Sequence, residues 1–298
     1  MNSLDTKQKR IAIIGSGISG QTCGYLLSKQ HHVTLFEANA HLGGHTATID
    51  LDIDDKTLAV DTGFIVFNDR TYPNFIKMMD QIGIASKPTE MSFSVQNKAT
   101  GLEYNGHNLD TLFAQRRNLL RPRFYYFIME ILRFNRLSKK AHQSSQSNEG
   151  SLGDFLDKHG FSDYFATHYV LAMTAAIWSS SISSCREFPL QFFLNFLSNH
   201  GLLDIANRPQ WYVIEGGSRS YIEGLTKSIQ SVRLNCPVQW VSRHHDHVEI
   251  TSNDSTEVFD EVIFACHSDH ALALLNDPSL EESQVLGAMK YRSNDVVL

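Results

Sequence analysis

The residues with the clearest chemical meaning lie near the start of the chain. Gly15, Gly17 and Gly20 follow the β-branched run 11–14 in the spacing Gly-x-Gly-x-x-Gly. Gly15 allows a tight turn, Gly17 lets the backbone approach a phosphate closely, and Gly20 lets the following helix pack on the strand. Free N–H groups at the start of that helix present partial positive charge to an anion. The spacing therefore predicts that a pyrophosphate binds at this turn.

An acid after the next strand completes the pattern. Residues 21–30 read as a helix, and residues 33–36 form a second apolar run that ends in Glu37. A carboxylate at this place accepts hydrogen bonds from ribose hydroxyls and repels a 2′-phosphate, which disfavours NADP. Strand, glycine turn, helix, strand and acid in this order form the fingerprint of a dinucleotide-binding fold. A strand-to-helix turn that holds no nucleotide is the alternative.

A second glycine pair separates flavin from nicotinamide. Gly43-Gly44 follows Glu37 by several residues and leads into His45-Thr46. The run from Ile11 to His45 resembles FAD proteins of the glutathione-reductase type, in particular the flavin amine oxidase and phytoene desaturase superfamily. The Gly-Gly-His-Thr run resembles a bacterial branch of predicted NAD/FAD-binding, amine-oxidase-like proteins, whereas most of the superfamily carries Arg in place of His45.

This resemblance implies the cofactor FAD and a set of contacts to it. The residues it assigns to the cofactor are Gly15, Ser16, Gly17, Ile18, Ser19, Gly20, Glu37, Ala38, Gly43, Gly44, His45, Gly63, Phe64, Val238 and Ala265. Gly63 and Phe64 would lie beside the flavin ring, with a plain β-turn and a core position for Phe64 as the alternative. Val238 would face the adenine. The resemblance identifies no catalytic residue within this chain.

The resemblance also implies the fold class and the domain plan. We expect an α/β protein with a Rossmann-like FAD-binding domain built on a parallel sheet, and a largely helical α+β substrate domain inserted in it. Residues 8–75 and 208–270 are assigned to the FAD-binding domain, and residues 76–207 and 271–298 to the substrate domain. Because the superfamily continues beyond the position of Leu298, we expect this chain to be C-terminally truncated relative to it.

Local patterns predict the remaining elements. These are a hairpin around Asp54-Asp55, a helix over 72–82, strands over 91–95, 101–104, 232–238 and 260–266, and mostly helices from 109 to 197. Trp178 reads as a core residue, with a pocket wall as the alternative. Trp211, Gly216 and Gly217 read as flavin or substrate contacts, or as a turn before a helix that Ser218 caps.

One basic segment has two interpretations. Residues 113–140 contain Arg116, Arg117, Arg121, Arg123, Arg133, Arg136, Lys139 and Lys140 against the single acid Glu130, with aromatic and aliphatic residues between them. We favour an insertion helix with a solvated basic face. The alternative is peripheral membrane contact, with rings in the acyl boundary and cations at anionic headgroups.

Composition and residue spacing disfavour several kinds of partner, location and site. A net charge of −6 disfavours nucleic acid as a partner, because duplex binding needs a basic face. Four scattered cysteines indicate a reducing compartment, and no apolar run predicts a signal peptide or a spanning helix. We therefore expect a cytoplasmic protein. No metal is expected: in a strand, His245 and His247 share a face while His244 points away, and the segment itself reads as a hairpin turn.

Three functional hypotheses remain. The first is an FAD-dependent oxidoreductase that dehydrogenates a C–N or C–C bond of a small-molecule substrate, an amine or an apolar lipid-like compound, by hydride transfer to flavin N5. The second is a non-catalytic or truncated dinucleotide-binding scaffold. The third is an NAD-dependent dehydrogenase, which shares the turn but leaves Gly43-Gly44 and Gly63 without a role.

Overall fold

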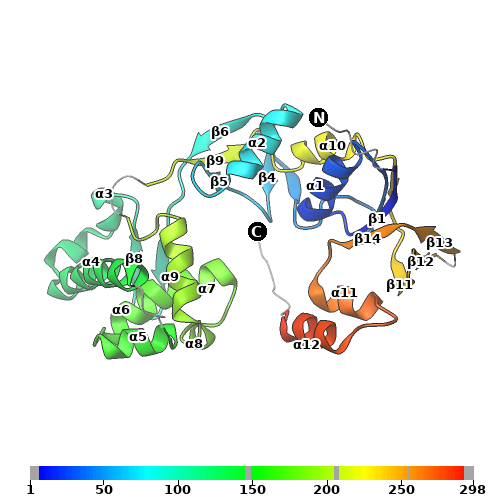
Figure 1. Cartoon of the computed structure of the whole chain (residues 1–298). Helices are drawn as coiled ribbons and strands as arrows, with labels where there is room; N and C mark the ends of the chain where they lie inside the picture. The colour runs from blue at the N-terminus through cyan, green and yellow to red at the C-terminus, as the bar shows by residue number, and fades with distance from the viewer. Residues whose placement is uncertain (1–6, 145–148, 205–207, 254, 292–298) are drawn as a thin grey trace, which may run out of the picture. The chain divides into compact units, whose positions relative to one another are not determined.

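The computed structural model of the chain describes residues 7–144, 149–204, 208–253 and 255–291 (Figure 1). The chain divides into two compact units. The first contains Met1–Val66, Asn74–Lys87 and Val213–Leu298, and the second contains Phe67–Pro73 and Pro88–Tyr212. Strands β6 (Ser86–Thr89) and β9 (Trp211–Ile214) continue from one unit into the other.

A four-stranded parallel sheet forms the centre of the first unit. Its order is β10 (Ser231–Arg233), β2 (His32–Phe36), β1 (Arg10–Ile14) and β14 (Glu261–Phe264). Ile13 of β1 lies between Leu35 of β2 and Ile263 of β14. The two outer strands come from the far end of the sequence, so the sheet unites both ends of the chain.

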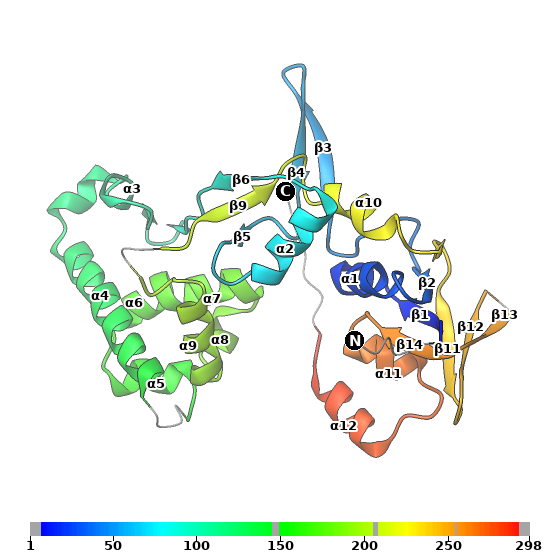
Figure 2. The same ribbon diagram turned by 45° about the horizontal axis from the view of Figure 1, so that its top comes forward.

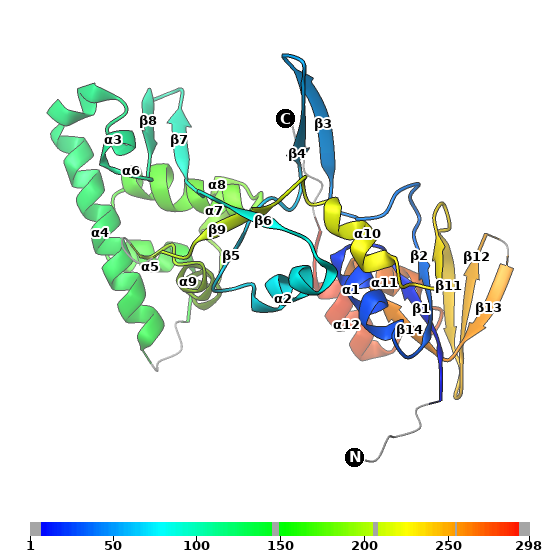
Figure 3. The same ribbon diagram turned by 90° about the horizontal axis from the view of Figure 1, so that it is seen from above.

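The two faces of this sheet are covered by different layers, which explains why β1 is apolar at every buried position. Ile11 and Ile13 pack on the side of helix α1 (Ile18–Leu27), together with Leu27. Ala12 and Ile14 pack on the opposite side. That second layer is an antiparallel sheet of β11 (Val238–Arg243), β12 (Val248–Ser252) and β13 (Ser255–Phe259), seen side by side in Figure 3.

The first unit also contains a long hairpin and two further helices. Strands β3 (Thr48–Ile53) and β4 (Lys56–Asp61) form the hairpin seen in Figure 2, and every residue of one is paired with a residue of the other. Asp54 and Asp55 take φ angles of 49° and 59°, the conformation of a two-residue type I′ turn. The predicted hairpin is therefore confirmed. Helix α2 (Pro73–Ile82) confirms the predicted helix over 72–82, and α10 (Ser220–Thr226) follows β9.

The last described helices pack with the first unit. These are α11 (Ser268–Leu274) and α12 (Leu280–Ala288). Arg243 of β11 holds the connecting segment and the first turn of α12, because its guanidinium binds Asp277 at 3.1 Å and Glu282 at 2.6 Å. The placement differs from the expectation that residues 271–298 belong with the second domain. The chain was expected to leave the first domain after β14, but α11 returns to β11 instead.

The second unit is largely helical, as predicted. Its elements are β5 (Phe67–Asn68), β7 (Ser94–Asn97), β8 (Leu102–Asn105), α3 (Leu109–Leu112), the 3-10 turn Arg116–Leu120, α4 (Pro122–Gln143), α5 (Leu152–Lys158), α6 (Asp163–Phe165), the π-type turn Ala166–Val170, α7 (Leu171–Trp178), α8 (Ile182–Cys185) and α9 (Leu190–Asn199). An aromatic core holds them together. The ring of Phe134 meets those of Phe155, Phe161 and Phe165 within 6.1 Å.

Two further sequence expectations can be compared with the structure. Trp178 packs against Phe188 and Phe196, which supports the core interpretation. The predicted strand over 232–238 is instead two strands, β10 and β11, separated by residues 234–237. Within the described residues, no helix combines the length and the apolar character needed to cross a bilayer.

Replacing Phe134 with Ala tests the importance of the aromatic core. The side chain is fully buried, so its loss should cost about 3–5 kcal/mol of unfolding free energy through lost burial and a cavity. Phe192→Ala is the matched control, because Phe192 is 52% exposed and should cost under about 1 kcal/mol. Urea unfolding followed by helical circular dichroism measures both, and equal losses would contradict the packing described.

Candidate functional site

The glycine turn after β1 is built by close contacts at two of its three glycines. Gly15 has a φ of 104°, and a Cβ atom there would lie 2.6 Å from the carbonyl oxygen of Ala265. A Cβ atom on Gly20 would lie 1.9 Å from the carbonyl oxygen of Gly15. Gly17 is different, because a Cβ atom there meets no atom of the described residues within 4 Å, apart from its two chain neighbours. The protein therefore excludes side chains at Gly15 and Gly20 but leaves open space over Gly17.

Helix α1 begins at this open space. Gly17 is its N-cap and supplies no side-chain cap, and the first turn contains no acid. The first helical hydrogen bond runs from the amide of Gln21 to the carbonyl of Gly17 at 3.0 Å. The helix starts at Ile18, earlier than the predicted 21–30, so Ile18 and Ser19 form its exposed first turn. The positive end of the helix dipole is left for an external anion.

Glu37 faces the glycine turn from the end of β2. One carboxylate oxygen accepts hydrogen bonds from the Ser16 amide at 3.0 Å and the Ser16 hydroxyl at 2.5 Å. The other accepts from the backbone and side-chain N–H groups of Asn39, both at 2.9 Å. Burial alone would raise the pKa of Glu37, but the hydrogen bonds from Ser16 and Asn39 outweigh it and lower the pKa below its usual value. The buried side chain is therefore ionised at neutral pH.

The second glycine pair lies against the first turn. The amide of Gly43 donates to the Ser16 carbonyl at 3.2 Å, and Gly43 forms a parallel bridge with Gly17. Gly43 and Gly44 take φ angles of 119° and 58°, and a Cβ atom on Gly44 would lie 3.1 Å from the Gly17 Cα. The pair is required to be glycine because its backbone touches the backbone of the turn.

A stack of aromatic rings stands next to this contact. The imidazole of His45 stacks on that of His267 at 5.9 Å, and His267 stacks on Tyr291 at 4.3 Å and on His270 at 5.5 Å. His267 follows Ala265 and Cys266, which adjoin Gly15. The fold thus places a second histidine beside His45, where most of the resembled superfamily has one arginine. Sequence reasoning gave His267 no role, because its pairing with His45 is visible only in three dimensions.

Gly63 and Phe64, which were predicted to lie beside the flavin ring, follow His45 along the chain. A Cβ atom on Gly63 would lie 2.0 Å from the His45 carbonyl oxygen, so Gly63 adjoins the second glycine pair. Phe64 is half-buried, and its ring packs against Phe75 at 5.4 Å. The structure therefore gives Phe64 a packing role, and its position beside a flavin stays a prediction.

The last three predicted contacts lie at strand ends. Ala38 comes shortly after β2, Ala265 directly follows β14, and Val238 is the first residue of β11. Cys236 donates its amide to the Glu37 carbonyl at 2.9 Å, so the loop before Val238 runs next to that acid. Val238 itself packs on the cluster that contains Phe36. Ala38 is exposed directly after Glu37, and the Ala265 amide donates to Ile14 at 2.8 Å. All predicted cofactor residues lie in the first unit.

Sequence reasoning missed or misread three features of the site. Gln21 is fully buried, donates to the Ser16 carbonyl at 2.7 Å, and has a side-chain oxygen that accepts no hydrogen bond from any residue the structure describes. Asn39 supplies half of the hydrogen bonds to Glu37. Ser218 does not cap α10. Its amide and hydroxyl donate to Asp61 at 2.9 and 2.8 Å, because Gly216 and Gly217 turn the chain towards β4.

A hollow elsewhere in the first unit lies away from this site. It has a volume of about 460 Å³ and is lined by residues that include Lys9, Leu27 and Glu261. These residues stand at the amino ends of β1 and β14 and at the last turn of α1. Ligands of parallel α/β sheets bind at the carboxyl ends of the strands, where the glycine turn lies.

Replacing Glu37 with Gln tests whether its charge holds the turn. The variant should lose about 1–3 kcal/mol of stability at neutral pH, because a buried amide cannot accept four hydrogen bonds. The folded pKa is depressed, so the carboxylate contributes stability above its unfolded pKa and loses it as pH falls through the folded value. Urea unfolding at pH 7 and at about pH 3 should show the difference shrinking in acid. Exposed Glu281→Gln is the control, and a pH-independent difference would contradict this account.

Comparison with known proteins defines the fold family. No curated protein matches the sequence significantly. The chain is similar to cyclohexylamine oxidase from Brevibacterium oxydans IH-35A, with a TM-score of 0.69, 17% identity, and coverage of 94% of this chain and 63% of that one. It is also similar to the fatty acid isomerase from P. acnes that produces CLA, with a TM-score of 0.65, 17% identity, and coverage of 95% and 64%.

A third solved structure has a similar fold at similarly low sequence identity. An oxidoreductase from Methanosarcina mazei has a TM-score of 0.64 and 18% identity, with coverage of 94% of this chain and 64% of that one. The chain thus spans less than two thirds of the length of these structures, and they establish its α/β fold. The sequence profile of the flavin containing amine oxidoreductases matches residues 18–298. The chain therefore belongs to the flavin containing amine oxidoreductase family.

Proposed function

We propose that this chain binds FAD across the glycine turn and forms part of an FAD-dependent oxidoreductase. The observation that carries the proposal is the combination of an ionised, buried Glu37 and an open space over Gly17 at an uncapped helix. An acid and a positive helix end at one turn match the sugar and the phosphates of an ADP-containing cofactor. The family is flavin-containing, which selects FAD over NAD.

The residues present fit such a cofactor. The amides at the start of α1 would hold the pyrophosphate, and the backbone of Gly43-Gly44 would lie beside it. Both oxygens of Glu37 are already bonded to Ser16 and Asn39. A ribose hydroxyl must therefore replace a movable side-chain donor, the Ser16 hydroxyl or the Asn39 amide, while the backbone donors stay. Ionised Glu37 would also repel a 2′-phosphate, which favours FAD over NADP.

The substrate is proposed to be an amine or an apolar, lipid-like molecule. A hollow of about 100 Å³ in the second unit is lined mainly by aromatic and apolar side chains, among them Phe93, Tyr104, Tyr169 and Trp211. Burial raises the pKa of Tyr169 to about 12, so its hydroxyl stays protonated. Similar structures include an amine oxidase and a fatty acid isomerase, which supports either substrate class. When bound, the flavin ring would accept a hydride equivalent from a substrate C–H bond, and loss of a proton from the neighbouring N–H or C–H would complete the C=N or C=C double bond.

We further propose that α4 provides a peripheral contact with an anionic membrane surface. Tyr125, Met129 and Leu132 are exposed and share one face of α4 at helical spacing, and exposed Arg136 and Lys140 continue that face. The opposite face carries the buried aromatic core. An exposed apolar stripe next to cations is typical of helices that lie at a lipid interface.

Cofactor binding can be separated from folding at Gly17. Its φ of −63° suits any residue, and within the described part of the chain a Cβ atom there contacts only its sequence neighbours, so Gly17→Val should fold normally. The same side chain would occupy the space proposed for the pyrophosphate, so FAD affinity should fall at least tenfold, or about 1.4 kcal/mol. Flavin fluorescence quenching measures affinity, and thermal melting measures the fold.

Two controls make this experiment decisive. Gly106→Ala, in a turn of the second unit with its nearest Cβ contact at 3.8 Å, should change neither property. Gly15→Ala should destabilise the fold itself, because of its φ of 104° and the 2.6 Å contact. Equal FAD affinity in the wild type and Gly17→Val would contradict the proposed site. Tighter binding of NADH than of FAD would favour a nicotinamide enzyme.

Vesicle sedimentation tests the membrane contact. The protein should bind vesicles that contain anionic phosphatidylglycerol and bind neutral phosphatidylcholine weakly, with binding reduced by salt. The double variant Met129→Asp and Leu132→Asp should lose most of this binding, because it replaces apolar side chains of the stripe with negative charges. The fold of the variant should be kept, because both side chains are exposed. Binding of the variant at the wild-type level would leave α4 as an ordinary solvated helix.

A further inference from the structure

The hairpin between β11 and β12 brings together side chains that the sequence pattern had separated. Arg243 pairs with Val248, and the amide of His244 donates to the carbonyl of His247 at 2.9 Å. His244 and His247 therefore stand opposite each other on either side of the turn. Their imidazoles stack with centroids 4.5 Å apart and planes 17° apart. The predicted hairpin turn is confirmed, but the strand alternation that would point His244 away from His247 does not apply, because the chain reverses between them.

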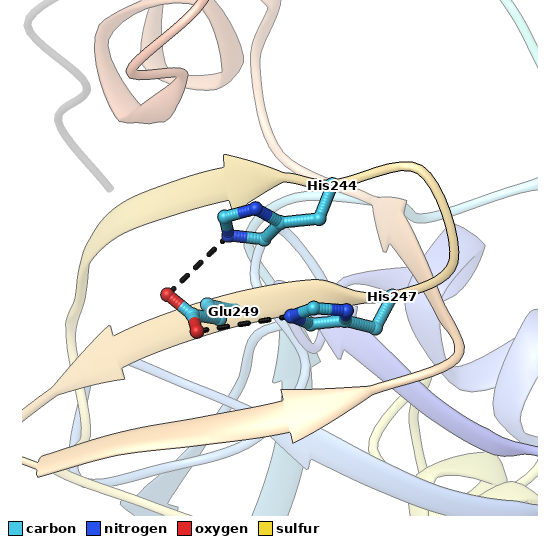
Figure 4. Close-up of side chains that lie close together, drawn as sticks. All are labelled: His244, His247 and Glu249. Carbon is cyan, nitrogen blue, oxygen red and sulfur yellow. Dashed lines mark ion pairs between the residues drawn. The ribbon is translucent and has the colours of Figure 1, made fainter.

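A carboxylate completes the cluster. Glu249 is the second residue of β12 and follows His247, which directly precedes that strand, by two positions. Figure 4 shows both imidazoles turned towards this carboxylate. The Nε2 atom of His244 lies 3.4 Å from one carboxylate oxygen, and the Nε2 atom of His247 lies 3.8 Å from the other.

These separations are those of a metal coordination sphere. One ligand atom from each of the three residues can be chosen so that all lie within 4.8 Å of one another. Ligands about 2.1 Å from a tetrahedral Zn²⁺ ion lie about 3.4 Å from each other. Small rotations of side chains that are 32–44% exposed are enough to reach this arrangement.

A neighbouring carboxylate orients one of the imidazoles. The Nδ1 atom of His247 lies 2.7 Å from an oxygen of Asp246. Donation of the Nδ1–H to Asp246 leaves Nε2 free on the side of Glu249. Metal-binding histidines usually have such an oxygen acceptor on their second nitrogen. The nearest arginine in the sequence, Arg243, is committed to Asp277 and Glu282.

We propose that His244, His247 and Glu249 form a binding site for a divalent transition metal ion, with Zn²⁺ as the ion that fits best. Two imidazole nitrogens and one carboxylate oxygen suit Zn²⁺, while Mg²⁺ and Ca²⁺ prefer sites made only of oxygen. The exposed position leaves a fourth coordination place to water. The site is separate from the glycine turn, and its occupation does not depend on the proposed flavin.

Calorimetric titration of the full chain with Zn²⁺ tests this site. We expect binding that Mg²⁺ does not reproduce, and affinity at least tenfold weaker in His247→Ala and in Glu249→Gln. His245→Ala is the matched control, because His245 lies in the same turn but outside the cluster, and it should bind as the wild type does. All three positions are surface positions, and thermal melting verifies that the variants fold.

A second described cluster, His267, Asp269 and His270, provides a competing location. The double variant His267→Ala and His270→Ala should retain the Zn²⁺ binding that His247→Ala loses. Co²⁺ should give visible absorption bands typical of a tetrahedral site in the wild type and not in His247→Ala. Absence of Zn²⁺ binding, or loss of binding only in the His267 and His270 variant, would overturn the proposal and leave His244, His247 and Glu249 as surface ion pairs.

Discussion

The carboxylate of Glu37 joins the end of β2 to the turn that follows β1. Ser16 gives it both a backbone and a side-chain hydrogen bond, and Asn39 gives it two more. A buried charge is stable only when it is so fully hydrogen-bonded. Because Gly43 donates to the Ser16 carbonyl, the same serine also fixes the second glycine pair. The positions of the glycine turn and of the second glycine pair at this edge of the sheet thus depend on that one ion and its donors.

The architecture around Glu37 follows from how the sheet is covered. Alternate residues of β1 face α1 on one side and the β11–β13 sheet on the other, so neither face is left to water. The loop before Val238 then crosses the end of β2, where Cys236 bonds to the Glu37 backbone. Arg243 in turn holds α12 against β11. Packing of the two layers therefore brings distant segments to the edge where β1 and β2 end.

Local sequence patterns were sufficient for the elements whose geometry is local. The Gly15-x-Gly17-x-x-Gly20 turn and the Asp54-Asp55 hairpin could be predicted because each depends on backbone conformation or periodicity, whereas the α/β class was implied by the family resemblance. Contacts between segments that are distant in the sequence could not be predicted in this way. The stacking of His45 on His267 joins residues far apart in the chain, and Ser218 bonds to Asp61 instead of capping its own helix.

The histidines of the β11–β12 hairpin show that contacts between residues close in the sequence can also escape prediction. Strand alternation places His244 and His247 on opposite faces, whereas a reversal between them places both beside Glu249. The sequence predicted a turn in this segment, but a shift of the turn by one residue changes which side chains meet, and the sequence alone does not fix that register. The predicted strand over 232–238 failed for a related reason, since its two ends join different sheets.

The order of strands in the parallel sheet has a consequence for synthesis on the ribosome. β1 and β2 leave the exit tunnel early, yet their outer neighbours β10 and β14 are made only after the whole second unit. Until then the first two strands have unpaired edges and exposed apolar faces, which can associate with other chains. The inserted unit, by contrast, is complete once Tyr212 has emerged. The helical unit can thus reach its native packing while the fingerprint that opens the sequence still waits for the last strand.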